Sequence, residues 1–391
     1  MKKLLVLSGS HSDIPLIEAG KRLGFHVITT GNDPTLVGHR YADEYHSVDF
    51  SDEQAILDLS RKLNIDAICS CANDFGAITA SYVAEKMGLP GHDPYEITLT
   101  LHHKHRFKEF ALSNKITTPY AASFSSPEKA CAELDKLSFP LIVKPVDLTG
   151  GKGVSKVNSK EEYIKAVRHA FSSSRRNKCL VEEFIQGTYH SFSTFVHDRK
   201  IVFCYSDNEY SFINPYLVTT SAAPAIGIEK VRYQLRQEAE RIIDLLSLCD
   251  GIFHIQYIQT GARAWILEIT RRCSGDFYPY PVNYATGLDW AEWIVKAESG
   301  FDCADFPQVV QRGFFGRHCV MSRRNGVVKS MNISHELEGN VIDKFVILAK
   351  GDVIDDYMVN KAGVVFLQYG CMDEMIQKTT NINNFVSVEV E

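Results

Sequence analysis

The chain has 391 residues, of which 45% are hydrophobic and 23% are charged, and its formal net charge is −6. This length allows two or three domains, and the acidic balance excludes a global basic field of the kind that holds nucleic acid or an anionic membrane. No apolar run reaches the roughly 18 residues that a membrane span needs. The ten cysteines are scattered through apolar segments, a pattern typical of reduced thiols in a cytoplasmic protein.

The first hundred residues alternate short apolar runs with amphipathic helical patterns. The strand-like runs are 3–9, 25–31, 42–50 and 65–74, and the helical patterns are 14–24, 52–64 and 75–88. Strand and helix in alternation predict a parallel sheet with helices on both faces. Because ligands bind at the carboxyl edge of such a sheet, the loops at 8–13, 29–34 and 70–76 are candidates for ligand contact.

Beyond residue 100 the regular alternation ends. A basic helical segment at 101–115 leads into a small α+β stretch over about 117–187, and strands dominate from 190 to 270 apart from one helix at 231–248. A β-rich pattern follows. The predicted domains are an α/β domain over 1–100, a central region over 101–305 that contains the smaller unit at about 117–187, and a small β-rich domain over 306–391.

A lysine at the end of a strand-like run precedes a loop that is nearly free of side chains. The apolar run 141–143 leads to Lys144, and the loop extends from Thr149 to Val154. Its glycines are Gly150, Gly151 and Gly153. Backbone N–H groups in such a loop can approach phosphate oxygens, and a nearby lysine adds positive charge. The loop matches neither GxxxxGK[ST] nor GxGxxG, so an ordinary turn remains the alternative.

A pair of carboxylates ends another apolar strand pattern. Glu182 and Glu183 close the run, and Phe184 and Ile185 follow. An apolar strand end with free backbone groups suits a purine base, which needs a flat apolar slot and hydrogen bonds along its edge. A solvated acidic turn explains the same residues, and this alternative stays open on the local pattern alone.

Two strand-like runs that are joined by a hairpin turn near residue 261 carry polar side chains. Gln256 lies in the first run and Glu268 in the second, and adjacent antiparallel strands can direct both side chains to one place. Oxygen ligands on rigid strands suit Mg²⁺ bound to nucleotide phosphates, and Arg271 and Arg272 follow closely enough to neutralise phosphate charge. A lone strand glutamate more often faces solvent, but the apolar flanks of Glu268 weaken that alternative.

In order and spacing, these segments resemble the ATP-grasp superfamily over roughly residues 1–300. The carbamoyl-phosphate synthase, biotin carboxylase and L-amino-acid ligase branches are the most similar. The resemblance implies mixed α/β and α+β architecture: an N-terminal parallel α/β domain, central ATP-grasp subdomains with a lid at about 117–187, and a small β-rich C-terminal domain. It also implies ATP and Mg²⁺ as cofactors, and a reaction in which ATP activates a carboxylate as an acyl phosphate that an amine captures.

Residue roles follow from the same resemblance, position by position. The implied nucleotide-binding residues are Lys104, Lys144, Thr149, Gly150, Gly151, Gly153, Val154, Glu182, Glu183, Phe184, Ile185 and His190. Among them, Lys104 and Lys144 would reach the phosphates, the backbone around Ile185 would read adenine, and His190 would contact the ribose. The implied metal ligands are Gln256, Glu268 and Thr270. The implied catalytic residues are Arg272, Lys144 and Glu268.

Two positions depart from the usual pattern of the superfamily. Thr270 stands where an asparagine is usual, and Gln256 stands where a glutamate is common. Fewer negative ligands predict a weak metal position and keep a non-catalytic nucleotide-binding relative as one alternative. A purine-pathway ligase or carboxylase is another, although the N-terminal loops lack a strong basic cluster for a phosphoribosyl group.

The acceptor substrate is expected to lie near the end of an N-terminal strand that faces the central cleft, and near the segment that follows the second metal strand. The candidate residues are Asn73, Asp74, Ser274, Gly275 and Asp276. The expected partners are a small-molecule carboxylate and an amine, with neither nucleic acid nor membrane involved. Dimers are common among the superfamily, so a homodimer is an expectation by analogy.

Overall fold

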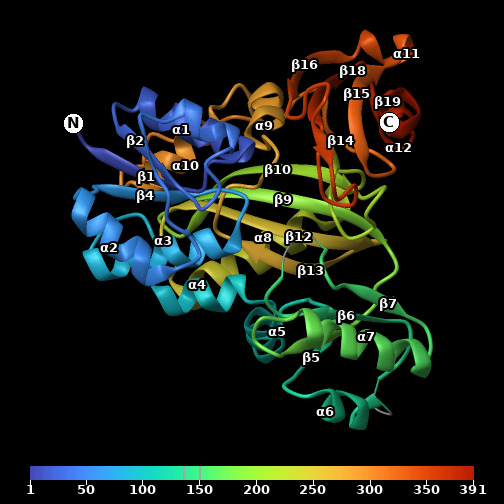
Figure 1. Ribbon diagram of the computed structural model, residues 1–391. Coiled ribbons are helices and arrows are strands. Elements are labelled where there is room, and N and C mark those ends of the chain that lie inside the picture. Colours follow the sequence, from blue (N-terminus) through green and yellow to red (C-terminus); the bar gives the residue numbers. More distant parts are fainter. Residues whose placement is uncertain (135–136, 149–150) are drawn as a thin grey trace.

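Four β-sheets organise the computed structural model, which describes residues 1–134, 137–148 and 151–391. Figure 1 shows the N-terminal sheet and its helices on one side, a long central sheet beside them, and a small sheet apart from both that contains β5 to β8. The last strands of the chain extend the central sheet and add a further small sheet. The expected mixture of a parallel N-terminal sheet with antiparallel sheets is confirmed.

The N-terminal sheet is parallel and has the order β3-β2-β1-β4. Its strands are β1 (Lys3–Leu7), β2 (His26–Thr30), β3 (Glu44–His46) and β4 (Ala67–Ser70), and its helices are α1 (Ile14–Arg22), α2 (Glu53–Leu63) and α3 (Asp74–Met87). Alternate residues of β1 enter different cores: Leu4 and Val6 pack in one cluster, and Leu5 and Leu7 in another. Both faces are therefore covered, as parallel strands require.

The central sheet has eight strands in the order β13-β12-β9-β10-β11-β14-β18-β16, and its neighbouring strands are antiparallel. Its strands are β9 (Thr188–His197), β10 (Lys200–Tyr210), β11 (Thr220–Ala223), β12 (Gly251–Thr260), β13 (Arg263–Thr270), β14 (Phe314–Val320), β16 (Val341–Val346) and β18 (Gly363–Tyr369). Three of these strands come from residues 306–391, so that region shares a sheet with the preceding one.

Different elements cover the two faces of the central sheet. The helix α8 (Ile228–Leu246) packs on one face, where Phe192 and Tyr257 join its core. On the other face, Phe195 shares a core with Leu4 of β1 and Trp290 of α10 (Trp290–Glu298), next to α9 (Pro279–Thr286). The N-terminal domain thus lies against the sheet face that carries the odd-numbered residues of β9.

A four-stranded sheet of order β5-β8-β6-β7 forms the unit predicted at about 117–187. Its elements are β5 (Ala121–Phe124), α6 (Pro127–Ala132), β6 (Leu141–Pro145), β7 (Ser155–Val157), α7 (Lys160–Ser173) and β8 (Cys179–Glu183). The helical segment that leads to it is two helices, α4 (Tyr95–His102) and α5 (Lys104–Ser113), because the extended backbone of His103 interrupts the helical path.

The remaining elements lie near the C-terminus. They are β15 (Gly326–Ile333), α11 (His335–Glu338), β17 (Val353–Ile354), α12 (Met372–Thr380), α13 (Ile382–Phe385) and β19 (Val386–Val390). The strands β17, β15 and β19 form a sheet of their own, and α12 packs on β14 and β18. Among the described residues, no helix is both long and apolar enough to cross a membrane.

Candidate active site

Gln256 and Glu268 are direct cross-strand partners in the hairpin of β12 and β13. The register shifts immediately afterwards, since Tyr257 pairs with Ile266 and leaves Leu267 as an extra residue in β13. A bulge of this kind can re-aim consecutive side chains, and both Leu267 and Glu268 are partly exposed between buried neighbours. The two predicted metal positions are therefore side by side, with the Glu268 side chain 40% exposed.

Thr270 lies two residues beyond Glu268, so its side chain is on the same face of β13. The residue is buried, and its Oγ1 has no hydrogen-bond partner among the described residues. An unpaired buried hydroxyl beside a carboxylate and an amide leaves one further oxygen ligand available at this place.

Glu209 of β10 was not predicted from the sequence, yet it contacts the same group. Its Oε2 accepts a hydrogen bond of 2.5 Å from Nε2 of Gln256. Burial, together with the nearby carboxylates of Asp207 and Glu268, raises the pKa of Glu209 to about 8. The only sequence signal was the spacing of Asp207 and Glu209, which puts both acids on one face of the strand.

Lys104 is the first residue of α5 and points from the helix end toward this hairpin. Its Nζ lies 3.9 Å from Oε2 of Glu268 and donates a hydrogen bond of 3.1 Å to the carbonyl of Leu148. Leu148 directly precedes the glycine loop, so one lysine contacts both the carboxylate and the backbone that leads into the loop.

Lys144 is held by a buried carboxylate that two lysines share. Its Nζ lies 2.6 Å from Oε2 of Glu182, and Nζ of Lys108 lies 2.5 Å from Oε1. Burial alone would raise the pKa of Glu182, but the two ammonium groups outweigh it and hold the pKa at about 2. Burial lowers the pKa of Lys108 to about 8, although Glu182 opposes that shift. Glu182 and Lys108 are therefore both charged at neutral pH.

Lys108 was missed in the sequence, although a signal was present. It follows Lys104 by four residues, and residues at that spacing lie on the same face of a helix. Only 2% of its side chain is exposed, and it also donates to Oγ1 of Thr118. The spacing therefore indicated that Lys108 faces the same side of the helix as Lys104. The many basic residues of the segment made this lysine look like one more exposed side chain.

In the predicted hinge at 182–185, one carboxylate is buried and one backbone amide is left without a partner among the described residues. Glu182 points into the ion cluster, whereas Glu183 is exposed and its amide donates to the carbonyl of Tyr120. The amide of Phe184 donates to Pro140, and that of Ile185 has no hydrogen-bond partner among the described residues. The ring of Phe184 lies 3.7 Å from Nζ of Lys156.

The described part of the glycine loop is packed against the segment between β10 and β11. Thr149 and Gly150 lie outside the described residues. Gly151 and Gly153 have φ of +74° and +71°, and the amide of Val154 donates to the carbonyl of Gly151. A Cβ at Gly151 would lie 2.6 Å from the carbonyl oxygen of Tyr216, so the loop approaches that backbone as only glycine can.

Arg272 follows β13 and is paired with Asp74. Its Nε lies 3.0 Å from Oδ1 of Asp74, and only 13% and 15% of the two side chains are exposed. Asn73 caps the first turn of α3, because its side chain accepts a hydrogen bond from the amide of Phe75. Asn73 thus has a local partner, whereas Asp74 pairs with a residue far along the chain and joins the N-terminal domain to the end of β13.

The segment 274–276 contacts two loops of the N-terminal domain. The amide of Asp276 donates to Oγ of Ser12, and a Cβ at Gly275 would lie 2.8 Å from that of Ala72. Asp276 forms ion pairs with His11 at 3.0 Å and Lys361 at 2.5 Å. Burial would raise the pKa of Asp276, but Lys361, His11 and Arg317 hold it well below its usual range. Ser274 is partly exposed in the same segment.

The side chain of His190 does not lie on the sheet face that carries Gln256 and Glu268. Its neighbour Ser191 pairs with Gln256, so the side chain of His190 lies on the opposite face of β9. The ring stacks on Tyr257 in the core under α8, and burial lowers its pKa to about 4. The alternation of strand side chains, together with the register of β9 and β12, separates it from Glu268.

The fold and the site together define a class. A lysine-bearing strand and glycine loop on a small sheet, an acidic hinge, and a polar hairpin on a larger sheet are the parts of an ATP-grasp enzyme. Residues 102–214 match the ATP-grasp (A) domain of phosphoribosylglycinamide synthetase. These residues include Lys104, the glycine loop and the hinge.

Relatives of known name support the same class. The formate-dependent phosphoribosylglycinamide formyltransferase of Burkholderia pseudomallei (strain 668) is 28% identical over 284 residues, which are 69% of each chain. The structure of an L-amino acid ligase from Bacillus licheniformis matches with a TM-score of 0.83 at 19% identity, over 100% of this chain and 99% of that one.

A third match has nucleotide bound. The biotin carboxylase domain of a 2-oxoglutarate carboxylase from Hydrogenobacter thermophilus, in complex with MgADP, ADP and bicarbonate, has a TM-score of 0.78 at 15% identity, covering 100% of this chain and 91% of that one. The chain has the fold of ATP-grasp enzymes, and residues 102–214 are similar to an ATP-grasp domain.

Proposed function

We propose that the chain activates a small-molecule carboxylate with ATP and transfers the acyl group to an amine. The observation that carries the proposal is the charge arrangement around Glu268. Lys104 approaches it to 3.9 Å, and Lys108 and Arg272 also act on it electrostatically. Three cations from two separate segments around one partly exposed carboxylate suit a reaction between two anions, whose repulsion must be neutralised.

In the proposed reaction, an oxygen of the substrate carboxylate attacks the γ-phosphorus of ATP, and the bond to the β–γ bridging oxygen breaks to release ADP. The amine nitrogen then attacks the acyl carbon, the carbon–oxygen bond to phosphate breaks, and the nitrogen loses a proton. Lys104 and Lys144 neutralise the nucleotide phosphates, and Arg272 faces the reacting carboxylate. Residues 149–154 would exclude water from the acyl phosphate, which water destroys.

The residues present suit Mg²⁺ that is shared with nucleotide phosphates. Glu268, Gln256 and the unpaired hydroxyl of Thr270 are oxygen ligands on one face of the hairpin. Among residues 1–134, 137–148 and 151–391, no group of three His, Cys, Asp or Glu side chains could hold a metal ion. Phosphate oxygens would complete the coordination, as they commonly do for Mg²⁺, and the ion would neutralise phosphate charge.

The proposed adenine site is the end of β8. The unpaired amide of Ile185 supplies a donor for the base edge, and Phe184 supplies apolar surface. Glu182 lies on the same strand and forms ion pairs with Lys108 and Lys144, so these two lysines fix the position of the strand end.

The experiment is ADP release from ATP and Mg²⁺ with a panel of carboxylic acids, each with and without an amine. Formate with phosphoribosylglycinamide belongs in the panel because of the Burkholderia relative. Added hydroxylamine traps an acyl phosphate as a hydroxamate. Release that needs one acid, with a hydroxamate of that acid, supports the proposal, whereas ADP release with no trapped acyl group for any acid contradicts it.

We expect Glu268→Gln to lower turnover at least 100-fold, because it removes the only negative group of the hairpin ligands. Thermal unfolding should be nearly unchanged, since the side chain is partly exposed. Glu229→Gln, the same substitution at an exposed residue of α8, is the matched control. Turnover of Glu268→Gln within threefold of the wild type would refute this assignment.

A further inference from the structure

Asp74 is engaged on a single oxygen by two different side chains. Its Oδ1 accepts a hydrogen bond of 3.0 Å from Nε of Arg272 and one of 3.1 Å from Nδ1 of His102. The His102 side chain is fully buried, whereas Arg272 retains 13% exposure. The carboxylate therefore connects an inner histidine with an arginine that borders the candidate active site.

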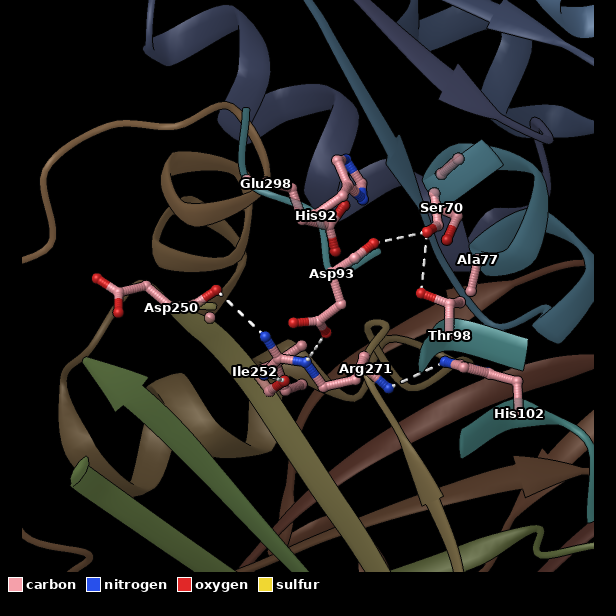
Figure 2. Close-up of a pocket in the computed structure, with 14 residues that line it drawn as sticks. Ser70, Ala77, His92, Asp93, Thr98, His102, Asp250, Ile252, Arg271 and Glu298 are labelled. Atoms are coloured by element: carbon pink, nitrogen blue, oxygen red, sulfur yellow. Dashed lines mark hydrogen bonds and ion pairs between the residues drawn. The ribbon is translucent and has the colours of Figure 1, made fainter. Parts of the chain in front are cut away.

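The ring nitrogens of His102 have separate roles. The peptide N–H of Arg271 lies 3.2 Å from Nε2 of His102, as Figure 2 shows. A peptide N–H can only donate, so Nε2 accepts and the ring hydrogen is on Nδ1, which donates to Asp74. The result is a directed chain of hydrogen bonds from the backbone of Arg271 through His102 to Asp74.

Arg271, whose amide begins this series of hydrogen bonds, is itself held in place by its side chain. The guanidinium of Arg271 lies 2.7 Å from Oδ2 of Asp93 and donates to the carbonyls of Cys249 and Ile252. Figure 2 shows the contact with Asp93 in the pocket between α4, β12 and α10. The two consecutive arginines thus differ: Arg271 is locked into the protein, and its backbone sets the position of His102.

The pairing leaves part of Arg272 available. Its Nε binds Asp74 and its Nη1 donates to the carbonyl of Cys273, whereas its Nη2 has no hydrogen-bond partner among the described residues. Burial would raise the pKa of Asp74, but Arg272, His102 and Lys104 hold it well below its usual range. An ionised carboxylate on one edge of the guanidinium directs the other edge away from it.

We propose that His102 and Asp74 are positioning residues, which hold Arg272 so that its free edge faces the reacting carboxylate beside Glu268. This rests on the proposed function, and it replaces the expected substrate contact of Asp74 with an indirect role. The N-terminal domain contributes the carboxylate, α4 contributes the histidine, and the end of β13 contributes both arginines. The site is therefore assembled across three parts of the fold.

The test compares His102→Leu, which removes the donor, with His102→Asn, whose Nδ2 can replace Nδ1 toward Asp74. We expect His102→Leu to lower kcat about tenfold or more with little change in ADP affinity, and His102→Asn to restore most of the loss. In an Arg272→Ala background, His102→Leu should cause no further loss, because the residues act as one unit. Equal losses in both backgrounds, or equal activity of the two His102 variants, would overturn the positioning role.

A spectroscopic readout does not depend on turnover. The ¹⁵N NMR signals of labelled histidine, assigned by their loss in His102→Asn, should report hydrogen on Nδ1 of His102 in the wild type. Hydrogen on Nε2 would overturn the chain of hydrogen bonds even in an active enzyme. A wild type that traps no acyl phosphate would instead remove the proposed function, while the tautomer still reports whether the chain exists.

Discussion

At the scale of single residues, the buried charges decide how the site is built. Glu182 is 3% exposed and is shared between Lys108 and Lys144, so its charge is compensated on both oxygens. Lys108 also donates to Thr118 on the segment before β5. The cluster consequently connects Glu182 of β8 with Lys144 of β6 and Lys108 of α5. Removing any one of these side chains leaves a buried charge poorly paired.

We expect Lys108→Met to lower the free energy of unfolding by about 3 kcal/mol, because Glu182 then keeps only one cationic partner. Urea denaturation at pH 7 measures the effect. Lys62→Met, at an exposed residue of α2, is the control and should change stability by less than about 0.5 kcal/mol. A loss below 1 kcal/mol for Lys108→Met would show that the ion cluster is not needed for folding.

At the scale of elements, the β13 bulge and the glycine loop shape the candidate active site. Without the extra residue Leu267, the side chains on one side of the bulge would point to the opposite face of the sheet. Glu268 would then not lie beside Gln256. The glycine loop contacts the segment between β10 and β11, where the amide of Lys156 also donates to the hydroxyl of Tyr216 at 2.9 Å. Asn214 in that segment donates to the carbonyl of Met358, so the loop is connected to the C-terminal region.

We expect Gly151→Val to lower kcat more than it weakens ADP binding. The residue has φ of +74°, and its new Cβ would clash with the backbone of Tyr216, so the loop could not close as it does here. Isothermal titration with ADP and steady-state turnover measure the two effects. Gly88→Val is the control, because Gly88 has φ of +68° with no atom near its Cβ position; equal losses of kcat and ADP affinity in Gly151→Val would count against a lid.

At the scale of the whole molecule, the junction between the N-terminal sheet and the central sheet contains a buried glutamate, Glu298. Glu298 of α10 is buried, and it lines the pocket of Figure 2 together with Ser70 of β4. Burial raises its pKa to about 8. The folded chain therefore binds a proton there that the unfolded chain releases near pH 4.5, and this junction weakens as pH rises.

We expect the wild type to lose stability relative to Glu298→Gln between pH 4.5 and about 8. The native state holds more protons than the unfolded state in that window, so the free energy of unfolding falls as pH rises through it. The difference at pH 8 should be on the order of 2–4 kcal/mol in favour of Glu298→Gln. Thermal unfolding of both proteins at pH 5, 6.5 and 8 measures it; parallel curves would mean that Glu298 is ionised throughout.

The sequence by itself determined the features that arise from local pattern. Alternating strand and helix signals identified the parallel N-terminal sheet, because hydrophobic periodicity is a property of neighbouring residues. The short hairpin predicted that the strands carrying Gln256 and Glu268 are neighbours, whereas the bulge at Leu267 decided that these two residues pair.

Only the tertiary structure decided the features that depend on distant contacts. Lys108 was hidden in a basic helix because its partner Glu182 is 74 residues away, and the face of His190 depends on the register between β9 and β12. The contact of Asp74 with Arg272 spans 198 residues. Burial and charge pairing of this kind are set by which segments meet in space, and a local pattern does not identify the partner of a buried charge.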